Sequence, residues 1–152
     1  MELLAEPFVN LLQAAHGIFG FVLFVALLMA CIFTFAVSAA NWKHIAVSSS
    51  VAAIAYLLTF LMGWLIYPVF RVDVRAAFLD KLNPWATGLF EIKEHLAAVG
   101  AFVALGVLSL ALFGRLLTAS CQRRQLFGGL LAAFGLLTAT VLLLGFIFRR
   151  AY

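Results

Sequence analysis

The chain has 152 residues, of which 66% are hydrophobic and 11% are charged, and its mean hydropathy is +1.17. Soluble domains typically carry about 25% charged residues, so the composition excludes an ordinary soluble domain and predicts one integral membrane domain over residues 1–152. The formal net charge of +4 is explained by an asymmetry between the two membrane faces, and we expect no nucleic-acid binding.

Glu2 and Glu6 precede the first apolar block, and no Lys or Arg does. Signal peptides begin with a basic region and have a shorter apolar core. The first block is therefore predicted to be a retained helix.

Four apolar blocks without any charge exceed the ~18 residues that mark a membrane-spanning helix. These blocks are Ile18–Ala40, Ile45–Tyr67, Leu96–Gly114 and Leu126–Phe148. The third span is predicted to begin a few residues before its charge-free block. The predicted spans are therefore about 18–40, 45–67, 90–114 and 126–148. Short links follow the first and third blocks, which predicts an all-α, up-down-up-down four-helix transmembrane bundle.

Four spans place the N-terminus, residues 68–95 and the C-terminus on one side, here called face A. The links 41–44 and 115–125 then lie on the opposite side, face B. Face A has six Lys and Arg residues against four on face B. The first helix usually dominates the positive-inside rule, however, and it has no base before it and Lys43 after it. We therefore predict a bacterial inner-membrane protein with face B in the cytoplasm and both termini outside.

The long connection between the second and third spans holds eight of the sixteen charged residues, between Arg71 and Glu94. Residues 72–82 are predicted to form a short amphipathic segment on the membrane. Asn83-Pro84 then predicts the start of the third helix, because Asn is a good N-cap and Pro suits the first helical position. The dense opposite charges favour internal pairing with Glu91 or Glu94 over a diffuse attraction to lipid phosphates.

His16 and His95 are predicted at the same depth near face A, where the first and third helices enter the lipid. Bundles build cofactor sites from facing helices, and haem iron accepts axial histidine. The hypothesis is a b-type haem between helices one and three, held by His16 and His95, with Arg71 or Arg75 on its propionates. Room for the macrocycle is expected beside Gly17, Gly20, Gly63 and Gly100. The alternative is a pair of boundary histidines that only form hydrogen bonds.

Glu91 and His95 are four residues apart and share a helix face. Glu94 points elsewhere, but with His16 the two residues are candidates for three ligands to a non-haem metal, since carboxylates and imidazoles suit several transition metals. In the alternative interpretation Glu91 only orients the His95 imidazole, or belongs to a solvated helix end.

The fourth span carries small residues at near-heptad spacing, which predicts a packing seam. They are Gly128, Ala132, Gly135, Ala139 and Gly145. We expect this seam to pack inside the bundle.

The functional hypothesis is a small subunit of an electron-transfer or respiratory membrane complex, not an enzyme on its own. Its expected partners are the lipid bilayer, other membrane or peripheral subunits that contact residues 68–95, and a quinone. Two alternatives stay open: a non-catalytic structural or assembly subunit of a larger complex, and a small metal-handling membrane protein.

Overall fold

The computed structural model describes residues 6–36, 42–114 and 120–149, and every element in this part of the chain is helical. Two elements, named η, are wide π-helical segments. In chain order the elements are α1 (Glu6–Cys31), η1 (Ile32–Ala36), α2 (Trp42–Phe70), η2 (Arg71–Leu79), α3 (Asp80–Leu82), α4 (Pro84–Phe113) and α5 (Ser120–Arg149).

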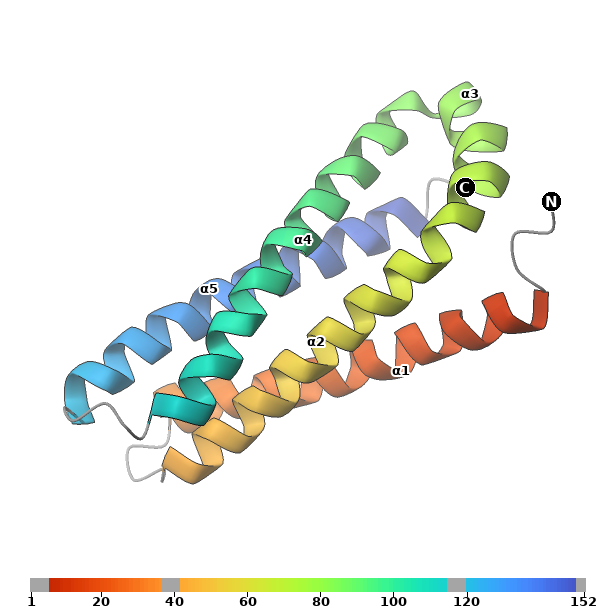
Figure 1. Ribbon diagram of the computed structural model, residues 1–152. Coiled ribbons are helices and arrows are strands. Elements are labelled where there is room, and N and C mark those ends of the chain that lie inside the picture. The colour runs from red at the N-terminus through yellow and green to blue at the C-terminus, as the bar shows by residue number, and fades with distance from the viewer. Residues whose placement is uncertain (1–5, 37–41, 115–119, 150–152) are drawn as a thin grey trace.

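Long apolar helices that alternate in direction form the bundle (Figure 1). Within the described residues, four stretches are long and apolar enough to cross a membrane: Glu6–Ala36, Trp42–Leu82, Pro84–Phe113 and Gln125–Ile147. The predicted four-span, all-α fold is confirmed. The helices extend beyond the predicted spans, and α1 already begins at Glu6. A charge-free block marks the part of a helix that lies in lipid, whereas backbone hydrogen bonding continues past that boundary.

The helices pack in chain order. α1 packs along α2, α2 along α4, and α4 along α5, while α1 and α5 touch at few residues. The second spanning helix therefore lies between the first and the third. The expectation that helices one and three face one another is wrong, because the short first link makes α2 the neighbour of α1 and α2 also takes the face of α4.

The centre of the bundle combines small residues of α1, α2 and α4 with larger ones from all four long helices. Four alanines of this centre are fully inaccessible: Ala30, Ala52, Ala53 and Ala104. Small side chains let helix backbones approach closely, which matters in lipid because no hydrophobic force drives the helices together. Phe134 of α5 fills the remaining space edge-on to Tyr56, with 5.2 Å between the ring centroids.

The buried stripe of α5 is formed mainly by larger side chains: Phe127, Leu131, Phe134 and Thr138. Ala132 and Ala139 of the predicted seam are exposed, so the seam as a whole does not pack inside the bundle. Gly128 is buried and lies against Phe35 and Thr34, both of η1. The seam prediction failed because α2 and α4 already contribute alanines and Gly100 to the centre. The side chains of α5 that face the centre therefore have to be large enough to fill the remaining volume.

The connection between α2 and α4 is itself helical, and its first part, η2, follows α2 without a break. Pro68 lies inside α2, and the next turns are wide: the N–H of Asp80 donates to the carbonyl of Arg75, five residues earlier. Proline removes one helical hydrogen bond and displaces the preceding turn, a common setting for a change of helical width. α3 then ends at Leu82. The carbonyl of the next residue, Asn83, accepts the N–H of Ala86 at 2.9 Å, and α4 begins at Pro84 as predicted.

Both ends of this connection lie at the same end of the bundle as the first turn of α1 and the last turns of α5 (Figure 1). The arrangement of face A is thus the predicted one. Arg115 and Arg150, which enter the charge count of the two faces, lie outside the described residues.

Candidate functional site

Residues 68–95 form a helical hairpin at face A, here called the face-A hairpin. It has its own small core, in which Leu79 and Ala86 are buried and Phe70, Val74 and Phe90 pack against them. The rings of Phe70 and Phe90 are stacked at 4.3 Å between centroids. The amphipathic character predicted for residues 72–82 is the cause, since Val74 and Leu79 turn inward while Arg71 and Asp73 stay exposed.

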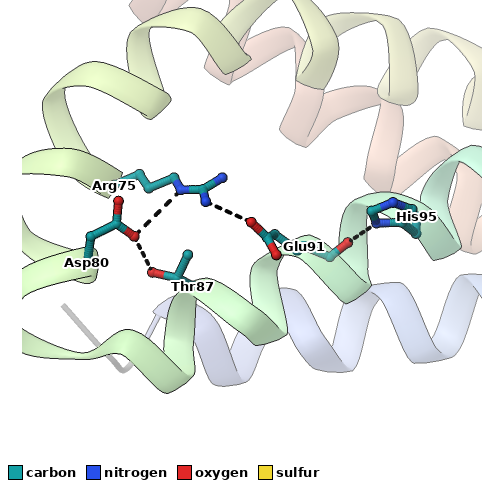
Figure 2. Close-up of polar contacts among 5 residues, drawn as sticks. All are labelled: Arg75, Asp80, Thr87, Glu91 and His95. Atoms are coloured by element: carbon teal, nitrogen blue, oxygen red, sulfur yellow. Dashed lines mark hydrogen bonds and ion pairs between the residues drawn. The ribbon is translucent and has the colours of Figure 1, made fainter.

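A polar network crosses the face-A hairpin (Figure 2). Arg75 Nη2 donates to Glu91 Oε1 at 2.7 Å, and Arg75 Nε lies 3.6 Å from Asp80 Oδ1. The Thr87 hydroxyl donates to the same Asp80 oxygen at 2.8 Å. The network ties η2 and α3 to the first turns of α4, and it confirms the predicted internal pairing, with Glu91 as the partner.

The two candidate arginines differ in what they can still bind. Arg75 is partly buried and already engaged by two carboxylates, whereas Arg71 is exposed on η2. Of the two residues predicted to meet a propionate, Arg71 is the exposed one.

His16 is half-buried between α1 and α2. Its Nδ1 lies 2.9 Å from the carbonyl oxygen of Thr59. A carbonyl only accepts, so Nδ1 carries the proton and Nε2 is left as the unprotonated nitrogen of the neutral ring. The ring also fills the space beside Gly63, where an added Cβ would lie 3.4 Å from His16 Cε1.

His95 is exposed on α4, on the same side as Ile92 and Val99. Its Nδ1 lies 2.7 Å from the backbone carbonyl of Glu91 (Figure 2), and because a carbonyl only accepts, Nδ1 donates this hydrogen bond and Nε2 takes no part in it. The Glu91 carboxylate does not orient this imidazole, because it is bound to Arg75.

The structure therefore holds the two imidazoles on different helices with different partners, and it does not bring them against one another. Two of the glycines expected to make room for a macrocycle face side chains of this chain instead. His16 lies beside Gly63, and the Tyr56 hydroxyl lies against Gly100 and donates to the carbonyl of Ala97 at 3.0 Å. Gly17 and Gly20 face open space. No contact of the structure tests whether a haem binds, and haem ligation by His16 and His95 stays a prediction.

The non-haem alternative needs three or more ligands at one point. Among the described residues, no group of three His, Cys, Asp or Glu side chains is placed to hold a metal ion. Glu91, the central member of the predicted set, is committed to Arg75.

Lys93 is a residue whose position the sequence did not indicate. Its side chain is half-buried and reaches across to α5, where an added Cβ on Gly145 would lie 3.6 Å from Lys93 Cε. Its ammonium lies 5.3 Å from the centroid of the Phe90 ring, within the range of a cation–π contact. The sequence did contain one indication of the contact between Lys93 and Phe90, because their spacing places both residues on one helix face.

Comparisons of the chain with protein-family models, with curated proteins and with solved structures found no match. The fold and the composition define the class: an integral membrane protein with four membrane-spanning helices, in contact with the lipid bilayer.

Proposed function

We propose that this chain is a small subunit of a larger membrane complex, which it contacts through the face-A hairpin. The observation that carries the proposal is that the hairpin pairs charges across its own elements but leaves large apolar side chains uncovered. Its carboxylates Asp80 and Glu91 are bound to Arg75, while large apolar groups stay uncovered: Val72, Leu82 and Trp85.

The length of α4 supports this proposal. Its 30 residues correspond to about 45 Å, against a hydrocarbon core of about 30 Å. The first turns of α4, and the hairpin with them, reach into the headgroup region and beyond. Exposed Leu82 and Trp85 in that region are typical of a surface that another protein covers, although tryptophan also favours the membrane interface itself.

Site-specific photo-crosslinking tests the proposal in the native membrane. A crosslinker at position 85 is expected to give a defined adduct with a second polypeptide. A crosslinker at position 64 is the matched control, since Trp64 is a similarly exposed tryptophan within α2. Lipid adducts alone at both positions contradict the proposal.

A second candidate is the electron-transfer function with a b-type haem. The specific observation in its favour is that both His16 and His95 use Nδ1 toward a backbone carbonyl, the arrangement by which proteins orient histidines that bind a metal through Nε2. The haem would supply one-electron redox chemistry. The imidazoles would hold the iron, exposed Arg71 would face a propionate, and a quinone is the candidate electron partner.

The visible spectrum of the purified chain, in detergent, tests this candidate. Haem bands are expected, and they are expected to be lost or shifted in His16→Ala and His95→Ala. His44→Ala is the matched control, because His44 lies at face B. A colourless preparation, or bands that are unchanged in both variants, removes the haem proposal and leaves the assembly proposal intact.

The orientation is proposed as above, with face A outside a bacterial inner membrane. In a chain without Cys31 and Cys121, Lys81→Cys is expected to react with a membrane-impermeant thiol reagent in intact cells. Lys43→Cys is expected to react only after the membrane is opened. Both native lysines are exposed, so the reverse pattern assigns the faces the other way.

A further inference from the structure

A groove lies between the first and second helices at face B. Its volume is about 380 Å³, within the range of about 300–1,000 Å³ that is common for ligand sites. Residues of α1 and η1 form one wall and the first turns of α2 the other: Ala26, Met29, Phe33, Lys43, His44, Val47, Ser48 and Val51. It shares no residue with the face-A hairpin.

The groove is polar at one end and apolar along its length. Lys43 and His44 are exposed in the first turn of α2, and the His44 ring lies 5.6 Å from the ring of Phe33. Val51 lies eight residues further along α2, which is about 12 Å of helix. The hydroxyl of Ser48 donates to the carbonyl of His44 at 2.7 Å, so this wall residue is already satisfied and the deeper part of the groove is apolar.

The polar end also favours an anion through the backbone. The N-terminal end of a helix dipole is positive and attracts anions such as phosphate. α2 begins at Trp42, so the ammonium of Lys43 and the start of the helix place positive charge at the same end of the groove, beside the His44 imidazole. Among the described residues that line the groove, none is acidic.

We propose that this groove binds one anionic phospholipid, with its phosphate at Lys43 and His44 and part of an acyl chain between α1 and α2. The pattern matches a lipid because the charged mouth lies at the headgroup level, where the helix begins, and the apolar walls run from there into the hydrocarbon. Met29, Val47 and Val51 are exposed along the walls, so a chain can enter sideways from the bilayer.

The experiment measures binding of phosphatidylglycerol and phosphatidylcholine, with identical acyl chains, to the purified full chain in detergent, by native mass spectrometry and by the shift in thermal unfolding. Preferential binding of phosphatidylglycerol is expected. Lys43→Gln is expected to weaken it about fivefold, the contribution of roughly one basic residue near an anionic headgroup. Lys81→Gln, an exposed lysine at face A, is the matched control and is expected to leave binding unchanged.

A second pair of variants tests the apolar part. Val47→Trp fills the groove and is expected to reduce the binding of phosphatidylglycerol, whereas Val25→Trp, at an exposed valine of α1 that does not line the groove, is expected not to. Equal binding of the two lipids, or equal losses in the two lysine variants, overturns the proposal. So does protection by glycerol phosphate alone, because it shows that no acyl chain is needed. If Val47→Trp abolishes a self-association of the wild-type chain and leaves lipid binding unchanged, the groove holds a second copy and the proposal is wrong.

Discussion

The centre of the bundle and the face-A hairpin are held together by different means. The centre uses fully buried alanines and one close contact between Gly100 and Tyr56. The hairpin uses stacked aromatic rings and the pairs that Arg75 makes with Glu91 and Asp80. Close packing is the stabilising force that remains inside lipid, whereas at the membrane surface water is present and apolar burial and ion pairs act together.

The two regions are also separate clusters. Leu79 and Ala86 belong to the hairpin core, and neither belongs to the core formed by α1, α2, α4 and α5. The comparison therefore predicts that the hairpin can be loosened while the bundle stays folded. Three substitutions test whether the two regions are stabilised separately, and they are given in decreasing order of expected effect.

Leu79→Ala is expected to have the largest effect, because Leu79 is only 1% exposed and removing a buried leucine side chain typically costs about 2–5 kcal/mol. Hydrogen exchange is expected to speed up in η2, α3 and the first turns of α4 and to stay unchanged in α2 near Ala52. Leu82→Ala, at a leucine that is 70% exposed, is the matched control. A uniform loss of protection over the whole bundle would show that the two clusters unfold as one.

Gly100→Ala is expected to destabilise the centre. An added Cβ overlaps the Tyr56 hydroxyl, so the ring must move and its hydrogen bond to Ala97 is lost. Overpacking of this kind costs about 1–3 kcal/mol, measured as a lower midpoint of thermal unfolding in detergent. Gly88→Ala lies in open space on the same helix and is expected not to lower the midpoint, because alanine favours a helix over glycine. An equal loss in both variants would mean that the contact with Tyr56 does not set the cost.

Glu91→Gln is expected to have the smallest effect. The pair with Arg75 is partly exposed, with side-chain exposures of 47% and 24%, and such ion pairs contribute about 0.2–1 kcal/mol. The stability of the wild-type hairpin is expected to fall with added salt, and this salt dependence is expected to be weaker in the variant. Lys81→Gln, which removes an exposed charge of the same hairpin, serves as the control. An unchanged salt dependence in Glu91→Gln would show that the ion pair does not contribute to the stability of the hairpin.

Much of the fold was predictable from the sequence, and the reason is the cost of polar groups in lipid. Each charge-free block lies, as far as the structure describes it, in a helix that is long and apolar enough to span a membrane, since an unpaired backbone cannot remain in hydrocarbon. Asn83-Pro84 marked the start of α4 for a local reason, the geometry of the first helical turn. The pairing of Arg75 with Glu91 was expected from charge density, although the choice of Glu91 over Glu94 depended on how η2 folds back on α4.

The candidate site was predicted less well. His16 and His95 do occupy the end of the bundle at face A, but their placement assumed that helices one and three are neighbours. The space at Gly63 and Gly100 was expected to be empty, yet residues of other helices, His16 and Tyr56, lie there. Such contacts join residues 41 or more positions apart, and no local pattern records them.

The sequence alone predicted four membrane-spanning helices and placed half of the charged residues between Arg71 and Glu94, because hydrophobic length and charge position are local properties. The tertiary structure was needed to show that α2 separates α1 from α4, that Ala132 and Ala139 of the α5 seam are exposed, and that Lys93 reaches toward Gly145. These outcomes depend on which helix faces meet, and that choice is made by the volumes of side chains from all four helices at once.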